Sequence, residues 1–313
     1  MKISRQCLKY ISHISINRSW RNFSSVSSEF CGRRMYSDHL KRTASNTRHE
    51  VVSGATVVKV EDESPTVKKL TLKVHDRRLF FKAGQWVDMV IPDVAKVGGF
   101  SMCSSPRQLV QDGLLDLAVK RSDHPPALWV HTQCRVDMEV SIRSGGDTFY
   151  DPKPDDPSSD LLLIAGGIGI NPLYSILCHV TDLLGSKGDK LETNGGNSAG
   201  ADNSVYTPGR VCLLYSASTE EELIFQKQLS EAADQFPGIE CQYFVTRKHT
   251  ESTSPHVKNH RINPEDIQDS LKKLRKGKTL VYICGPSPMI ETMETILLNS
   301  GIDPRQILYE KWW

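Results

Sequence analysis

Short runs that alternate between apolar and polar residues fill the chain from Glu50 to Tyr150. Successive side chains of a strand point to opposite faces, so these runs predict half-buried β-strands separated by turns that contain glycine and proline. Regularly spaced short strands of this kind predict a small antiparallel barrel. A single helix, containing His131, is expected within it. The expected strands are 51–64, 67–74, 85–92, 114–121 and 138–145.

The pattern changes after the segment 151–160, whose proline and aspartate residues indicate a linker. The apolar run 161–165 is continuous, as expected of a parallel strand buried on both faces. Strands and helices then alternate over 158–313, which predicts a doubly wound parallel α/β sheet. The low-complexity stretch 185–209 is interpreted as a mobile surface insertion. The expected strands are 161–165, 211–218, 239–247 and 279–285, and the expected helices are 171–184, 219–236, 264–275 and 287–301.

Composition narrows the class of protein. The chain has 313 residues, of which 38% are hydrophobic and 24% charged, and its net charge of +2 does not favour nucleic acid. The longest apolar segment, 161–177, is too short and too interrupted to span a membrane. The eight cysteines contain no C-x-x-C pair, and His249, His256 and His260 lack metal-ligand spacing, so we expect no metal site.

The first 36 residues differ from the rest. They carry seven basic residues against one acid, Glu29, and are rich in serine. This composition is typical of an organellar transit peptide. The sequence "RRMY" at 33–36 resembles a mitochondrial processing site, which predicts a mitochondrial protein. The alternative is a disordered basic tail.

A glycine cluster, "IAGGIGINP" at 164–172, lies between the first strand and the first helix of the second domain. Bare backbone at a strand-to-helix turn lets N–H groups bind an anionic group. The sequence matches neither the G-x-G-x-x-G fingerprint nor a P-loop. Further turns follow neighbouring strands at 215–218, 245–248 and 284–289, and we expect them to converge on one crevice.

The barrel pattern, together with "GGIGINP", "CGPSPM" and the terminal "YEKWW", resembles the ferredoxin–NADP reductase superfamily over about 50–313. The resemblance implies a flavin-binding barrel at 50–150 and a nucleotide-binding domain at 158–313. It implies that Cys284 packs beside the nicotinamide, that Glu310 lies near flavin and nicotinamide, and that Ser101 lies near the reactive flavin nitrogen. The implied nucleotide contacts, to which we add Ser216 in the crevice, are Gly166, Gly167, Ile168, Gly169, Ile170, Asn171, Pro172, Gly285 and Pro286. The implied flavin contacts are Phe100, Ser104, Gly145, Gly146, Thr148 and Trp312.

Two departures weaken the flavin half of the resemblance. Gly98 stands where the family motif has a phosphate-binding arginine, a contact worth about 1.5–3 kcal/mol. The family's phosphate loop is replaced by "DHPPALW" at 123–129, and prolines have no N–H to donate. Lys120 or Arg121 are candidates to compensate. We therefore expect FAD, or FMN, to bind weakly.

The acidic run Glu220–Glu222 follows the second strand of the nucleotide-binding domain. Acids favour the first turn of a helix, and they also disfavour the 2′-phosphate of NADPH, so NADH is the expected nucleotide. Arg247 or Lys248 would reverse this preference. The resemblance implies a flavin-dependent NAD(P)H oxidoreductase whose electron acceptor is unknown and could be a separate redox protein. The alternative is a catalytically idle nucleotide-binding or redox-sensing protein with a degenerate flavin site.

Overall fold

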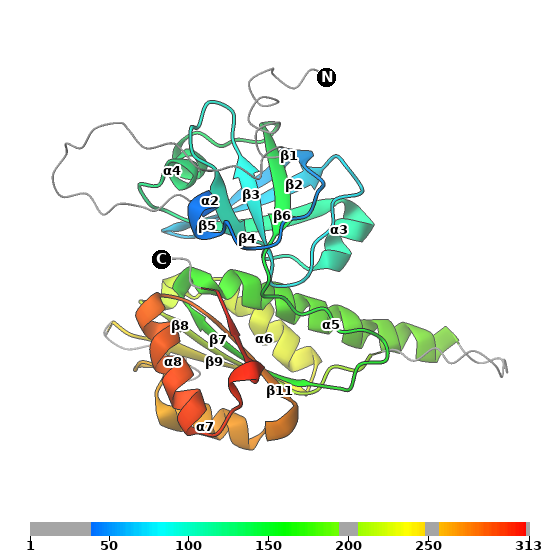
Figure 1. Cartoon of the computed structure of the whole chain (residues 1–313), viewed down its shortest axis with the longest axis vertical. Coiled ribbons are helices and arrows are strands. Elements are labelled where there is room, and N and C mark those ends of the chain that lie inside the picture. The colour runs from blue at the N-terminus through cyan, green and yellow to red at the C-terminus, as the bar shows by residue number, and fades with distance from the viewer. Residues whose placement is uncertain (1–38, 194–205, 248–256, 311–313) are drawn as a thin grey trace.

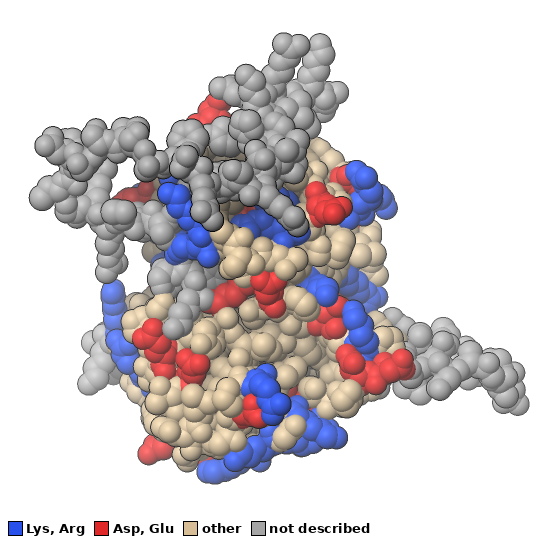
Figure 2. All heavy atoms as spheres, viewed as in Figure 1, with Lys and Arg blue, Asp and Glu red and all other residues tan. Residues whose placement is uncertain are grey.

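The computed structural model describes residues 39–193, 206–247 and 257–310, which form two domains stacked one on the other (Figure 1). The expected transit peptide, Trp312 and the histidines His249 and His256 lie outside the described residues. Basic and acidic side chains alternate in small groups on the face shown in Figure 2.

The first domain is a six-stranded antiparallel sheet with the strand order β4-β3-β6-β1-β2-β5. A bridge between Met102 and Leu117 joins the two edge strands, β4 and β5, and closes the sheet into a barrel. Alternate side chains of each strand fill its interior, where Leu70, Leu72 and Leu115 have no exposed surface. The strands are β1 Ser53–Ser64, β2 Val67–Val74, β3 Trp86–Val90, β4 Gly98–Ser101, β5 Leu114–Lys120 and β6 Glu139–Gly145.

The prediction of a single helix in this domain was wrong. Among the described residues, the structure has two helices within 50–150, α3 Pro106–Asp112 and α4 Pro125–Thr132, which contains His131, and α2 His39–Arg42 precedes the barrel. Helix α3 begins at a Ser105 cap and ends at Gly113 with φ 67°. Only Leu109 of α3 is buried, and α2 has four residues, so neither helix has the apolar periodicity that reveals longer helices.

The second domain has a six-stranded sheet with the order β10-β9-β8-β7-β11-β12, and every adjacent pair is parallel. The chain thus has the two-domain fold class expected from its sequence. The strands are β7 Asp160–Gly166, β8 Val211–Ala217, β9 Ile239–Val245, β10 Val257–Lys258, β11 Thr279–Cys284 and β12 Ile307–Tyr309. The helices are α5 Ile170–Thr193, α6 Gln226–Gln235, α7 Pro264–Lys272 and α8 Ser287–Asn299.

Strand β7 explains the continuous apolar run. Leu161 and Leu163 belong to the core that packs on α5 and α6, whereas Leu162 and Ile164 belong to the core that packs on α7 and α8. Helices therefore cover both faces of the sheet, and α5 lies between the sheet and the barrel (Figure 1).

The segment 185–209, expected to be a surface insertion, is described only at its two ends. Helix α5 continues to Thr193. At the other end Tyr206 is 4% exposed, and its hydroxyl accepts hydrogen bonds from the Tyr150 hydroxyl at 3.0 Å and the Ser159 backbone at 3.2 Å. These residues belong to the folded domain, and 194–205 lie outside the described part. No described helix has the length and apolar character needed to cross a membrane.

Candidate functional site

The glycine turn follows β7, the strand at which the order of the second sheet reverses. Strand β8 lies on one side of β7 and β11 on the other, so the turn opens at a topological switch point, where α/β sheets bind ligands. A 3₁₀ turn, Gly167–Gly169, leads directly into α5. The first N–H groups of a helix have no partner within it, so a turn at this place is a candidate for binding an anion.

Each glycine of the turn has a different reason to be glycine. A Cβ on Gly169 would lie 2.3 Å from the Cys284 carbonyl oxygen, and one on Gly166 would lie 2.4 Å from the Met289 sulfur. These two residues let the turns after β7 and β11 approach closely. Gly167 has φ +56° and open space around its Cβ position, so it keeps the mouth of the site clear.

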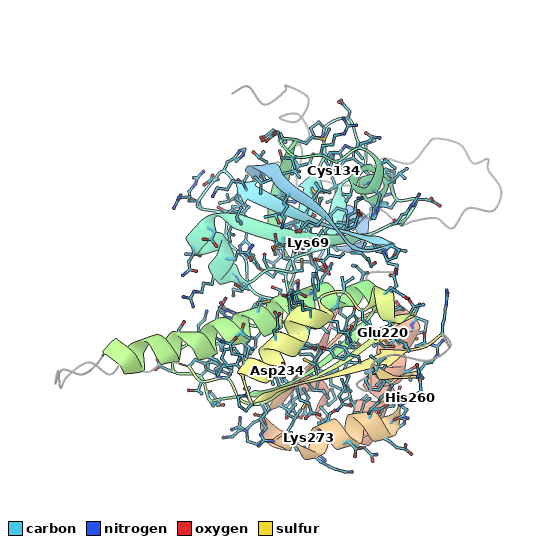
Figure 3. The ribbon with its side chains drawn as sticks, turned by 180° about the vertical axis from the view of Figure 1, so that it is seen from behind. Lys69, Cys134, Glu220, Asp234, His260 and Lys273 are labelled. Carbon is cyan, nitrogen blue, oxygen red and sulfur yellow. The ribbon has the colours of Figure 1, made fainter. Side chains whose placement is uncertain are left out.

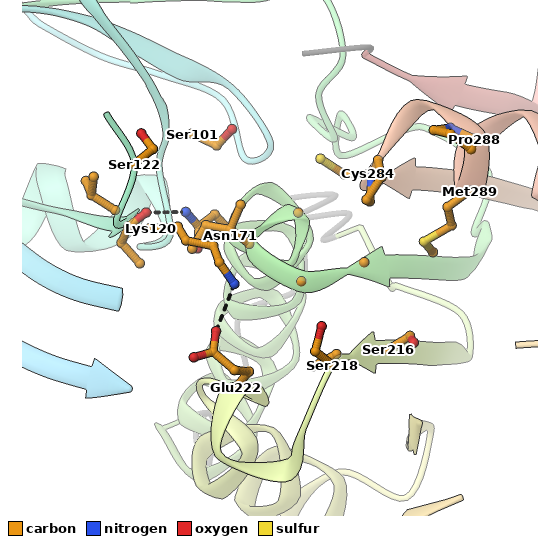
Figure 4. Close-up of a pocket in the computed structure, with 18 of the residues that line it drawn as sticks. Ser101, Lys120, Ser122, Asn171, Ser216, Ser218, Glu222, Cys284, Pro288 and Met289 are labelled. Atoms are coloured by element: carbon orange, nitrogen blue, oxygen red, sulfur yellow. Dashed lines mark hydrogen bonds and ion pairs between the residues drawn. The ribbon is translucent and has the colours of Figure 1, made fainter. Parts of the chain in front are cut away.

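A cleft of about 1330 Å³ runs between this turn and the barrel. Figure 4 shows Ser101 and Ser122 of the barrel on one side, Cys284 and Met289 on the other, and Asn171 between them. Among the described residues that line the cleft, the only carboxylate is Glu222, whereas the permanent cations are Arg42, Lys120, Arg121 and Arg261. The cleft thus carries the charge that an anionic ligand needs.

Most of the predicted site residues meet in this cleft. Those that line it are Phe100, Ser101, Gly166, Gly167, Ile168, Gly169, Asn171, Ser216, Cys284 and Pro286. Three others lie beneath the surface of the two turns: Ile170 has no exposed area, and Pro172 and Gly285 are also buried. These three support the backbone of the turns.

Four residues of the implied flavin set do not line the cleft. The Ser104 hydroxyl accepts a hydrogen bond from the Asp116 backbone, and the Ser104 carbonyl accepts one from Ser175 of α5, so Ser104 joins structural elements. A Cβ on Gly145 or Gly146 would lie 2.9 or 2.7 Å from the buried Trp86 indole, so both glycines make room for that ring. The fourth, Thr148, follows them in the same loop.

Glu310 lies near Cys284 but does not itself line the cleft. The Cys284 side chain lines the cleft but is 5% exposed. Burial and the nearby Glu310 charge raise the pKa of its thiol to about 12, so it remains neutral and packs as a small apolar group. The Glu310 carboxylate accepts a hydrogen bond from the Asp147 backbone at 3.2 Å and thereby contacts the barrel loop.

Glu310 gives a pH prediction. Burial raises the pKa of this carboxyl above its ordinary value, although hydrogen bonds from Asp147 and Thr148 oppose the shift. Its negative charge therefore costs stability as the pH rises above the unfolded pKa of about 4.3. We expect Glu310→Gln to raise the free energy of unfolding at neutral pH and to leave it unchanged in acid. Urea unfolding from acid to neutral pH measures the difference in the free energy of unfolding between Glu310→Gln and the unaltered chain. A stability gain from Glu310→Gln that is largest in acid would contradict the prediction.

The sequence did not reveal how the domains are joined at the cleft. Glu222 accepts a hydrogen bond from the Thr66 hydroxyl of the barrel at 2.7 Å. It also pairs with Lys120 of the barrel at 2.9 Å (Figure 4). Asn171 Nδ2 donates to the Ala118 carbonyl at 2.7 Å. The Lys120 ammonium is thus engaged in an ion pair with Glu222. Figure 3 shows Glu220, two residues before Glu222, near the junction of the domains. Partners about a hundred positions apart leave no local sequence signal.

Comparisons with known proteins agree with this geometry. The model of the oxidoreductase NAD-binding domain family matches residues 163–295. Oxidoreductase NAD-binding domain-containing protein 1 of Bos taurus is 48% identical over 280 residues, which cover 88% of this chain and 85% of that protein. A ferredoxin NADP⁺ reductase from Neisseria gonorrhoeae, solved with FAD and NADP, is similar with a TM-score of 0.63 and 19% identity, covering 85% of this chain and all of that one. The cytochrome b5 reductase domain of Ulva prolifera nitrate reductase is similar with a TM-score of 0.62 and 16% identity, covering 83% and 98%. The fold expected from the resemblance to the ferredoxin–NADP reductase superfamily is confirmed.

Proposed function

Because the chain belongs to the family of oxidoreductase NAD-binding domain-containing protein 1, we propose that it is an NAD(P)H-dependent flavin oxidoreductase. One observation carries the proposal: a single cation-rich cleft joins the glycine turn of the α/β domain to Phe100 and Ser101 of the barrel. Two ligands held on these opposite walls would meet in the middle of the cleft.

The α/β wall supplies what a reduced pyridine nucleotide requires. The N–H groups of the turn that leads into α5 would face the diphosphate, and Gly167 leaves room for it. Met289, Met293 and the neutral Cys284 thiol form an apolar floor beside the turn. This floor would exclude water from the nicotinamide while the anionic part of the molecule stays at the turn.

The part of the barrel wall that would contact the ring system of a flavin fits this ligand. Phe100 offers an aromatic face, and Ser101 offers a hydroxyl within the cleft. A bound flavin would accept a hydride from the nicotinamide and deliver electrons to an acceptor. The phosphate-binding part differs, because α4 begins with Pro125 and Pro126, which have no N–H. The cations of the cleft, rather than backbone N–H groups of α4, would therefore bind the phosphate of a flavin.

The visible spectrum of the purified full chain tests the proposal. We expect flavin absorption bands, after reconstitution with FAD or FMN, that bleach when NADH is added without oxygen. The second candidate, an idle nucleotide-binding or redox-sensing protein, is favoured by Gly98 and the two prolines. A protein that binds NADH but stays colourless with both flavins would support that candidate and contradict the enzyme.

We also propose NADH as the preferred nucleotide. Glu220, Glu221 and Glu222 surround the end of β8 with negative charge, opposed by Arg261 in the cleft. We expect NADH to bind about tenfold more tightly than NADPH, because Glu222 in the cleft and Glu220 and Glu221 next to it in the chain add negative charge near a 2′-phosphate. Fluorescence titration measures both dissociation constants. Glu221→Gln should narrow the ratio, and tighter NADPH binding by the unaltered chain would refute the preference.

The remaining parts of the proposal concern the setting of the reaction. The composition of the first 36 residues supports a mitochondrial protein. Among the described residues, no group of three His, Cys, Asp or Glu side chains could hold a metal ion. We propose that the electron acceptor is a separate redox protein. Import of the full chain into isolated mitochondria, followed by sequencing of the new N-terminus, tests the location.

A further inference from the structure

Helix α2 precedes the barrel and is seated on strand β4 (Figure 1). The His39 ring lies against Gly99, where a Cβ would come within 2.2–2.5 Å of three ring atoms. The Phe100 ring covers Gly98 in the same way, with a Cβ position 2.4 Å from the ring. The two glycines of β4 therefore make room for aromatic rings.

A buried carboxylate holds α2 in this place. His39 Nε2 lies 2.9 Å from Asp88 Oδ1, and both side chains are 3% exposed. Arg48 and Arg143 each donate to Asp88 Oδ2 at 2.8 Å. Arg48 also donates to the carbonyl of Thr43, the residue after α2, at 2.6 Å. The end of α2 is thus fixed to the barrel by charge-assisted hydrogen bonds.

Arg42 is the last residue of this helix, and it lines the cleft with Gly99, Phe100 and His124. Gly98, the position that lacks a cation, directly precedes Gly99 and Phe100 in β4. A guanidinium binds two phosphate oxygens at once, which a lysine cannot do.

We propose that Arg42 supplies, from outside the barrel sheet, the cation that binds the phosphate of a flavin nucleotide in this cleft. This inference rests on the proposed flavin-dependent function. In it, the segment before the barrel becomes part of the binding site, and the Asp88 cluster sets the position of its arginine.

The test compares FMN with riboflavin, because the two differ only by the phosphate. Dissociation constants are measured on the full chain by quenching of flavin fluorescence, for the unaltered protein and for Arg42→Ala. We expect Arg42→Ala to weaken FMN binding by about 10- to 100-fold, the loss of a charge-assisted contact, and to leave riboflavin binding within about twofold. Arg42→Lys should recover part of the FMN affinity, and added salt should weaken FMN binding less in Arg42→Ala than in the unaltered chain.

Two further variants show whether a loss of FMN affinity in Arg42→Ala is specific to Arg42. Lys41→Ala removes an exposed charge from the same helix and should leave both affinities unchanged. Arg121→Ala removes the other candidate cation of the cleft. The proposal is overturned if Arg42→Ala weakens FMN and riboflavin equally, or if only Arg121→Ala removes the preference for FMN. In either case flavin still binds and the proposed function survives, whereas an unaltered chain that binds neither flavin overturns both.

Discussion

Replacing Gly167 with glutamate is expected to weaken NADH binding by at least about 100-fold while the chain still folds. The Cβ of residue 167 would point into open space, so the new carboxylate would extend into the cleft where we propose that the diphosphate binds. Two like charges in contact cost several kcal/mol in such a site. The free energy of unfolding should fall by only about 1 kcal/mol, because a residue with a Cβ is strained in a left-handed backbone at φ +56°.

Two controls separate charge in the cleft from other effects. Gly167→Ala adds the backbone strain without the charge, and we expect NADH affinity to fall less than about tenfold. Gly277→Glu adds the same charge at an exposed position with open space, at the opposite end of β11 from the cleft, and should change nothing. NADH fluorescence titration, with thermal unfolding as a check of the fold, measures all three variants. Unchanged affinity in Gly167→Glu would place the nucleotide elsewhere.

Replacing Asp88 with alanine is expected to lower the free energy of unfolding by about 3 kcal/mol or more. Asp88 is 3% exposed and is the shared partner of His39, Arg48 and Arg143. Its removal leaves two guanidinium groups, 13% and 15% exposed, without their counter-charge. Because His39 fixes α2, FMN affinity should fall as well, which joins this prediction to the role proposed for Arg42.

The Asp88 effect has a defined pH dependence. Although burial opposes it, hydrogen bonds from His39 and Arg48 hold the pKa of this carboxyl well below its ordinary range. The stabilisation is therefore present above the unfolded pKa of about 3.9 and is lost as the pH falls below it. Urea unfolding should show the difference between Asp88→Ala and the unaltered chain shrinking in acid.

A matched carboxylate in the same barrel provides the control. Asp62 pairs with Lys68 at 2.6 Å but is 73% exposed, so Asp62→Ala should cost less than about 1 kcal/mol. Equal losses from Asp62→Ala and Asp88→Ala would show that burial of the Asp88 cluster contributes nothing to stability.

The sequence was sufficient to predict those elements that follow from local hydrophobic patterns. The alternation in 67–74 gives β2, and the uniform apolar run after Asp160 gives β7, because its two faces meet two different cores. The glycine cluster was also placed correctly at the end of that strand. What the sequence left undecided was which glycine faces the ligand, since that depends on Cys284 and Met289 from a turn more than a hundred residues away.

The missed features all depend on distant contacts. Strand β4 reads "GGFS", which has no alternating apolar pattern, and its glycines are explained only by rings that pack on them. The basic segment before the barrel gave no sign that His39 and Arg48 converge on Asp88. Glu222 was interpreted from its place in an acidic run, yet its carboxylate is engaged by Thr66 and Lys120 of the other domain.

The most direct test of the central claim is hydrogen exchange of the backbone amides with and without NADH. The account predicts that NADH slows exchange in peptides that cover 164–172 and 284–289, and that Gly167→Glu abolishes this protection. Protection confined to other segments, with these two turns unchanged, would contradict the claim that the glycine turn binds the diphosphate.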